Sequence, residues 1–137
     1  MIHVYTDGAS AGNPGSSGAG ILFVYPNGEV EQLRYHLGFM SNHEAEFRAL
    51  ELALHIATKK GIQQLSIRTD SQLVSNSVDS GYIKNRAYRP FLERILTMQE
   101  TFDLFFIKWI PSKQNKKADE LARQAIHEPN RVYEEGL

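Results

Sequence analysis

The alternation of apolar and polar residues at the start of the chain predicts a group of three antiparallel strands. Every second residue from Ile2 to Thr6 lies on one face of an extended segment, and the residues between them, up to Asp7, lie on the other. This first strand ends at Asp7 and leads into a turn rich in Gly and Ser. Two further strands, at 18–25 and 30–38, flank a hairpin signal at Pro26–Glu29, and the partial alternation of the third indicates a sheet edge.

The pattern changes to helical spacing after residue 41. Apolar residues three and four positions apart predict a helix over 43–60, which begins near Ser41 or Asn42 and stops at Gly61. The remaining predicted elements are a strand at 64–70, a helix at 71–78 closed by Gly81, a helix at 90–100 begun by Pro90, a strand at 102–110 and a helix at 117–127. The apolar run of the last strand predicts that both of its faces are covered.

This order of elements predicts an α/β fold. Three antiparallel strands followed by alternating strands and helices give a five-stranded mixed sheet, with two parallel strands, flanked by helices. If the first and fourth strands are parallel neighbours, their carboxyl ends lie side by side. We expect one domain over residues 1–128 and a short polar tail over 129–137.

Composition and charge narrow the class of protein. The 137 residues are 42% hydrophobic, which suits a single domain, and the absence of cysteine excludes disulfides and thiolate chemistry. The chain shows no secretory leader and no apolar run near the roughly 20 residues of a membrane-spanning helix, so we expect a soluble, cytoplasmic monomer. Net charge is −1, yet residues 82–117 carry a local balance of +5, which suits a polyanionic substrate or a solvated face.

Four acids stand at the junctions of the predicted elements: Asp7, Glu46, Asp70 and Asp119. Three of them have a structural alternative: Asp7 could bond turn amides, Asp70 could cap the following helix, and Glu46 could interact favourably with the dipole of its helix. Four carboxylates brought together would repel one another unless cations offset their charge. All-oxygen ligation selects Mg²⁺ or Mn²⁺, and two such ions can hydrolyse a phosphodiester. The five histidines show no ligand spacing.

Four segments together resemble one family. The segments TDGASAGNPG at 6–15, SNHEAEFRAL at 41–50, TDSQLV at 69–74 and KKADELA at 116–122 closely resemble ribonuclease H type 1. The resemblance implies the ribonuclease H fold, with Asp7, Glu46, Asp70 and Asp119 as the metal-binding catalytic acids. It also implies two Mg²⁺ or Mn²⁺ ions and cleavage of the RNA strand of an RNA–DNA hybrid, which leaves a 5′-phosphate and a 3′-hydroxyl.

Substrate contacts are implied at positions that match the family: Asn13, Ser41, Asn42 and Gln72. Short amides and hydroxyls suit 2′-hydroxyl groups, although turn formation or helix capping would also explain Asn13, Ser41 and Asn42. Lys113 and Lys116 add positive charge near the last acid.

The sequence departs from the family in two places. The loop SKQNKK before the last acid lacks a histidine, and only Lys84, Arg86 and Arg89 remain of the basic segment before Pro90, which predicts weak hybrid binding. Both departures favour an alternative, a hybrid-binding module without catalysis, whereas the intact acids oppose it. An ATP-using domain of the actin type is opposed by length and by the missing phosphate loop. A resolvase or integrase on the same fold is a further alternative.

Overall fold

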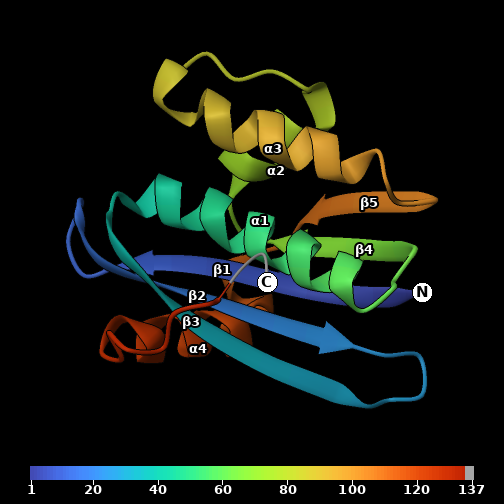
Figure 1. Ribbon diagram of the computed structural model, residues 1–137, viewed down its shortest axis with the longest axis horizontal. Coiled ribbons are helices and arrows are strands. Elements are labelled where there is room, and N and C mark those ends of the chain that lie inside the picture. Colours follow the sequence, from blue (N-terminus) through green and yellow to red (C-terminus); the bar gives the residue numbers. More distant parts are fainter. Residues whose placement is uncertain (135–137) are drawn as a thin grey trace.

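A five-stranded mixed sheet forms the centre of the molecule (Figure 1). The structure is a computed structural model that describes residues 1–134. Its strands are β1 (Ile2–Ser10), β2 (Gly15–Val24), β3 (Val30–Met40), β4 (Gln64–Thr69) and β5 (Leu104–Trp109). They lie in the order β3-β2-β1-β4-β5, with β1, β2 and β3 antiparallel and β1, β4 and β5 parallel. The predicted fold class, and the place of the third strand at a sheet edge, are therefore confirmed.

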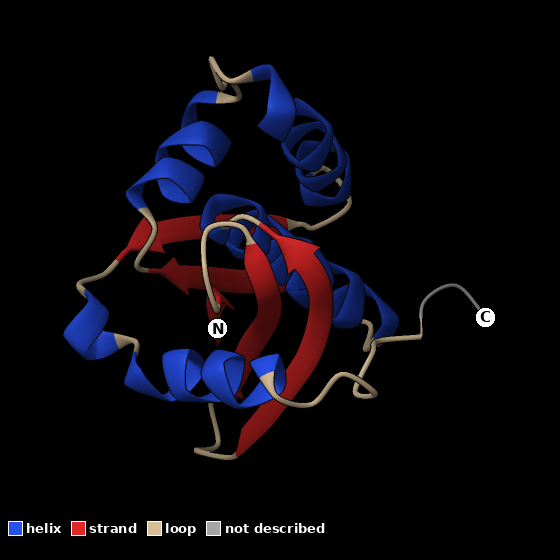
Figure 2. Cartoon of the chain, turned by 90° about the vertical axis from the view of Figure 1, so that its left-hand side faces the viewer, coloured by secondary structure: helices blue, strands red, loops and turns tan. Residues whose placement is uncertain are grey.

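Helices cover both faces of the sheet (Figures 1 and 2). They are α1 (Asn42–Lys59), α2 (Gln72–Ser80), α3 (Arg89–Gln99) and α4 (Lys116–Ile126), with short 3₁₀ turns at Arg86–Tyr88 and Ser112–Gln114. One face carries α1, with α2 and α3 packed beyond it, and the other face carries α4, which packs on β1, β2 and β3. The main core lies between α1 and the sheet, around the fully buried Val4, Phe23, Phe47 and Ile67.

Local sequence signals explain the ends of the helices. Ser41 caps α1 through a capping box with Glu44, as the predicted start at Ser41 or Asn42 requires. Gly81 ends α2 in the left-handed conformation, with φ of 71°. These ends lie within one or two residues of the predicted ones.

Two predictions about strands were wrong. The first strand does not end at Asp7, because β1 continues to Ser10 and its last residues pair with the Gly- and Ser-rich start of β2. The last strand is not covered on both faces, because β5 lies at the sheet edge, where Phe106 is 52% exposed. The apolar run of β5 has only one face packed against the core, through Phe105 and Ile107.

The predicted tail at 129–137 lies partly outside the described residues. Up to residue 134 it follows β3: the backbone amide of His36 donates to the carbonyl of Arg131 at 2.6 Å, and the ring of Tyr133 packs on Tyr35. Within the described part of the chain, none of the helices is long and apolar enough to cross a membrane.

Candidate active site

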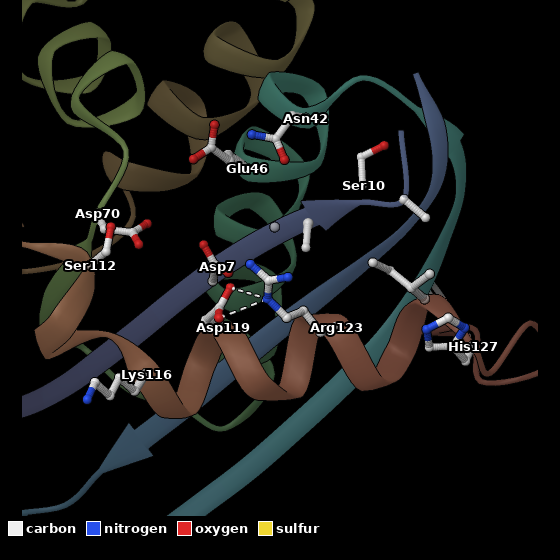
Figure 3. A pocket seen from close by; sticks show the side chains of 14 residues that line it. Asp7, Ser10, Asn42, Glu46, Asp70, Ser112, Lys116, Asp119, Arg123 and His127 are labelled. Atoms are coloured by element: carbon white, nitrogen blue, oxygen red, sulfur yellow. Dashed lines mark hydrogen bonds and ion pairs between the residues drawn. The ribbon is translucent and has the colours of Figure 1, made fainter. Parts of the chain in front are cut away.

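Asp7 occupies the centre of a pocket lined by all four predicted acids (Figure 3). It lies within β1 and is 8% exposed. The parallel pairing of β1 with β4 ends at Thr6 and Thr69. The residues that follow this pair, Asp7 and Asp70, therefore lie side by side. This places Asp70 at the carboxyl end of β4, where ligand crevices form in parallel sheets.

Two glycines allow helices to approach Asp7 from both sides of the sheet. A Cβ at Gly8 would overlap the backbone of α1 at Ala45 and Glu46, and a Cβ at Gly20 would overlap the backbone of α4 at Ala118. Since Gly20 is the direct partner of Asp7 on β2, α4 lies against the strand at the level of this acid. Glycine at these positions therefore brings the starts of α1 and α4 to the same strand.

The start of α4 is also fixed by a buried side chain. Asn115 is 1% exposed, and its Nδ2 donates to the carbonyl oxygen of Thr6 at 2.9 Å. This bond joins the residue before α4 to the residue before Asp7. It therefore sets the position of Asp119, one turn into the helix, relative to β1.

Three of the four acids converge closely. Asp7, Glu46 and Asp70 each offer a carboxylate oxygen, and these three oxygens lie within 4.8 Å of one another. This distance fits shared coordination of divalent ions by oxygen ligands. The three side chains come from β1, α1 and the end of β4, so only the folded chain assembles them.

The fourth acid, Asp119, lies beside Asp7, and its carboxylate is paired with Arg123 (Figure 3). The guanidinium Nε of Arg123, one turn further along α4, donates to both carboxylate oxygens of Asp119 at 2.9 and 3.1 Å. Asp119 is not part of the three-acid group within 4.8 Å. Arg123 thus offsets the charge of this acid.

The pKa values of the central acids reflect their crowding. Burial, followed by the charges of Asp70 and Asp119 and a hydrogen bond with Asp119, raises the pKa of Asp7 to about 9. Burial also raises the pKa of Glu46, while the adjacent His43, whose Nδ1 lies 3.1 Å from Glu46 Oε1, opposes that rise. Burial and the neighbouring carboxylates thus favour the protonated form of Asp7, and a bound cation would take the place of that proton.

Asp70 does not serve as a helix cap. The side chain of Ser71 accepts the amide of Val74 and caps α2, so the carboxylate of Asp70 is free of that structural task. The indole Nε1 of Trp109 donates to the carbonyl oxygen of Asp70 at 3.1 Å and holds its backbone in place.

The predicted substrate contacts lie around this pocket at different distances. Asn42 and Lys116 line it. The side-chain Oδ1 of Asn13 accepts a hydrogen bond from the backbone amide of Asn42 at 3.0 Å, which joins the turn after β1 to the start of α1. Ser41 caps α1. Gln72, at the start of α2, and Lys113, in the 3₁₀ turn, are exposed and are not among the residues that line the pocket.

Sequence reasoning missed several residues of the pocket. Ser10, Ser112, Arg123 and His127 also line it. The Asp119–Arg123 spacing of four residues on a predicted helix is a known ion-pair signal and would have identified Arg123. The contact of His43 with Glu46 has a local signal too, because these residues are three apart on one predicted helix. His127 at the end of α4 carries no such signal.

Comparisons with known proteins agree with this geometry. Residues 5–125 match the family described as reverse transcriptase-like. The EbsB protein of Enterococcus faecalis is 41% identical over 135 residues, which are 96% of this chain and 99% of that protein. The crystal structure of RNase H1 from Halobacterium salinarum superposes with a TM-score of 0.88 at 32% identity, over 93% of this chain and 98% of that one.

A second solved structure was determined with nucleic acid. LC11-RNase H1 in complex with an RNA/DNA hybrid superposes with a TM-score of 0.86 at 27% identity, over 93% of this chain and 98% of that one. The family match and these relatives extend over nearly all of the sheet and helices that carry the four acids. The chain therefore belongs to the ribonuclease H family.

Proposed function

We propose that the protein is a metal-dependent endoribonuclease that hydrolyses the RNA strand of RNA–DNA hybrids and leaves a 5′-phosphate and a 3′-hydroxyl. The observation that carries the proposal is the convergence of Asp7, Glu46 and Asp70 within 4.8 Å, with Asp119 beside Asp7. Family membership agrees with it, because the solved relative LC11-RNase H1 holds such a hybrid.

The donor set fits divalent ions of the hard class, with Mg²⁺ and Mn²⁺ as the proposed ions. All four candidates are carboxylates, and the buried Asp7 holds a proton at neutral pH that a cation can displace. Two bound ions would supply an activated water and stabilise the leaving oxygen of a phosphodiester. Asp7, Glu46 and Asp70 would hold the ions, and Asp119 would join them when it leaves Arg123.

The chain's own cations and amides would position the substrate. Arg123 and Lys116 line the pocket beside the acids, where they can contact phosphate oxygens. Asn42 lines the pocket at the start of α1, and its amide and backbone suit a 2′-hydroxyl group. Asn13, Ser41, Gln72 and Lys113 are proposed to contact the hybrid beyond the pocket.

The test compares cleavage of one sequence in three forms: RNA–DNA hybrid, duplex RNA and duplex DNA, each with Mg²⁺ and with Mn²⁺. We expect cleavage of the hybrid alone, in its RNA strand. A protein that binds the hybrid but cleaves nothing under either metal would instead be a binding module. Cleavage of duplex DNA would favour a resolvase-like activity.

The variant Asp70→Asn identifies the site responsible. We expect loss of hybrid cleavage with a nearly unchanged fold, because Ser71, and not Asp70, caps α2. The matched control is Asp79→Asn. Asp79 is an exposed residue of α2, and this variant should cleave as the wild type does. Full turnover by Asp70→Asn would remove Asp70 from the site. A cytoplasmic location and a monomeric state are further parts of this proposal, and light scattering tests the second.

A further inference from the structure

The sheet has a second surface that the proposed function does not use. On the side of α4, this helix packs on β1, β2 and β3, while β4 and β5 extend beyond it (Figure 1). Leu65 and Ile67 of β4 point into the core, so the alternate residues of this strand, Gln64, Ser66 and Arg68, point to the uncovered side. We call this surface the open face; it consists of His3, Tyr5, Gln64, Ser66, Arg68, Leu104, Phe106 and Lys108.

Strand pairing places these residues in rows across the sheet. Tyr5, Arg68 and Lys108 are direct neighbours on β1, β4 and β5, and His3, Ser66 and Phe106 form the adjacent row. Neighbouring strands lie about 4.8 Å apart, so each row spans roughly 10 Å. Rings and cations therefore alternate over an area that suits a few nucleotides.

The apolar groups of the open face are in contact with solvent. Phe106 is 52% exposed and Leu104 is 43% exposed, and Tyr5 is half-buried one strand further in. Adjacent exposed apolar side chains, such as Leu104 and Phe106 on one face of β5, are typical of interaction surfaces. Flat rings on a sheet are surfaces on which nucleic acid bases stack.

The charge of the open face is positive only. Its eight residues include Arg68 and Lys108 but no Asp or Glu, although the whole chain has a net charge of −1. Arg68 contacts Ser66 Oγ and His3 Nε2, both at 3.2 Å, and in residues 1–134 no carboxylate pairs with Arg68 or Lys108. Burial and the charge of Arg68 lower the pKa of His3.

A groove continues the open face toward α4. Tyr5, Leu22, Val24 and Lys117 line it together with Asn115. The Oδ1 atom of Asn115 is buried and has no hydrogen-bond partner. A buried acceptor without a partner is costly.

We propose that the open face binds single-stranded nucleic acid. Unpaired bases would stack on Phe106 and Tyr5, and the backbone phosphates would contact Arg68 and Lys108. The absence of acids argues for a polyanion over a basic or neutral protein partner. The exposed rings argue for unpaired bases over a duplex, whose bases are already stacked.

The open face adjoins the candidate active site, which gives the proposal a physical setting. Arg68 precedes Asp70 by two residues, and Trp109, next to Lys108, bonds the backbone of Asp70. A single strand that leaves a hybrid at the pocket could therefore cross β4 and β5. Binding at the open face does not itself require hydrolysis.

The experiment measures fluorescence anisotropy of labelled oligo-dT and oligo-U, each about 12 nucleotides long, with EDTA present. We expect Phe106→Ala to weaken binding of both roughly 5- to 150-fold, which is the range expected for one stacked base. Lys108→Ala should weaken binding and reduce its dependence on salt between about 50 and about 200 mM. Both variants change exposed side chains, and thermal melts check that they fold.

Matched controls come from elsewhere on the surface. Phe39, 75% exposed on the opposite edge strand β3, and the exposed Lys59 of α1 supply Phe39→Ala and Lys59→Ala. Both should bind the oligonucleotides as the wild type does. The proposal is overturned if the wild type binds neither oligonucleotide, or if Phe106→Ala and Phe39→Ala bind equally well.

Two further measurements distinguish nucleic acid binding at the open face from self-association and from hydrolysis at the pocket. If light scattering finds a wild-type dimer that Phe106→Ala dissociates, the open face binds a second copy of the chain and the proposal is wrong. Phe106→Ala should cleave a blunt hybrid at the wild-type rate. A wild-type protein that binds oligo-dT through Phe106 but cleaves no hybrid would contradict the proposed function and leave this inference standing.

Discussion

Replacing Asp7 by asparagine is expected to stabilise the metal-free protein while abolishing hybrid cleavage. Asp7 is 8% exposed, and burial, followed by the charges of Asp70 and Asp119, raises its pKa to about 9. Asparagine has nearly the same shape and no charge. The substitution therefore removes an ionisable group from a site that disfavours its ionised form, without opening a cavity.

The sign of the effect follows from the two pKa values of Asp7. The unfolded chain releases the proton near pH 3.9, whereas the folded chain keeps it to about pH 9. Between these values the folded state binds more protons, so the stability of the metal-free wild type falls as pH rises. At pH 7 the difference is about three pH units at 1.36 kcal/mol each, or ~4 kcal/mol, and it vanishes below about pH 4.

Thermal unfolding in EDTA between about pH 4 and pH 9 measures this difference. Near pH 7 we expect Asp7→Asn to melt higher than the wild type by roughly 10 °C, and near pH 4 the two should melt together. The exposed Asp103→Asn serves as the control and should follow the wild type at every pH. Added Mg²⁺ should stabilise the wild type but not Asp7→Asn, because the variant lacks a ligand.

A different pattern would refute the reasoning. If Asp7→Asn melts lower than the wild type near pH 7, or if the difference does not grow with pH, then Asp7 is ionised in the metal-free protein. In that case a cation of the chain would have to neutralise it, and the carboxylate cluster would differ in charge from the one described above.

Three other variants test the surroundings of the site. Arg123→Ala frees the carboxylate of Asp119, so isothermal titration should show tighter Mn²⁺ binding and fluorescence anisotropy should show weaker hybrid binding. Its stability should fall by less than about 1 kcal/mol. Unchanged affinities of Arg123→Ala for both ligands would contradict this. Gly8→Ala should destabilise by about 3 kcal/mol in urea and reduce cleavage, because its Cβ overlaps the backbone of α1. Glu51→Gln breaks a buried ion pair and should lower stability by about 1 to 3 kcal/mol, whereas the exposed Glu120→Gln should change it by less than about 1 kcal/mol.

Periodicity in the sequence predicted most of the fold because its signals are local. Helix α1 has an apolar stripe, a capping serine and a terminating glycine within one segment. The mixed sheet followed from the order of elements and the rules of crossover connection, whereas the parallel pairing of β1 with β4 was only a condition that the structure fulfils. The predictions failed where a contact between distant segments decides: the continuation of β1 to Ser10 depends on pairing with β2, and the exposure of β5 depends on where α4 ends.

The sequence was sufficient to select the acids of the candidate site, but not the side-chain contacts that surround them. The sequence placed Asp7 and Asp70 at the ends of predicted strands, and the structure brings their oxygens together with that of Glu46. No local pattern pairs Asn115 with Thr6, 109 residues away, although this bond sets where α4 begins. Side-chain contacts across such separations depend on angles and distances that periodicity does not specify.

The arrangement of the four acids determines what must happen when metal arrives. Burial and the neighbouring carboxylates favour the protonated form of Asp7, and Asp119 is paired with Arg123, so the structure offsets two of the four charges. If Asp7 and Asp119 hold divalent ions, the ions would displace a proton from Asp7 and compete with a guanidinium for Asp119, so metal affinity would depend on both pH and Arg123. A phosphate of the substrate can take the arginine that Asp119 gives up. Substrate and metal would then favour each other's binding, because each releases a group that opposes the other.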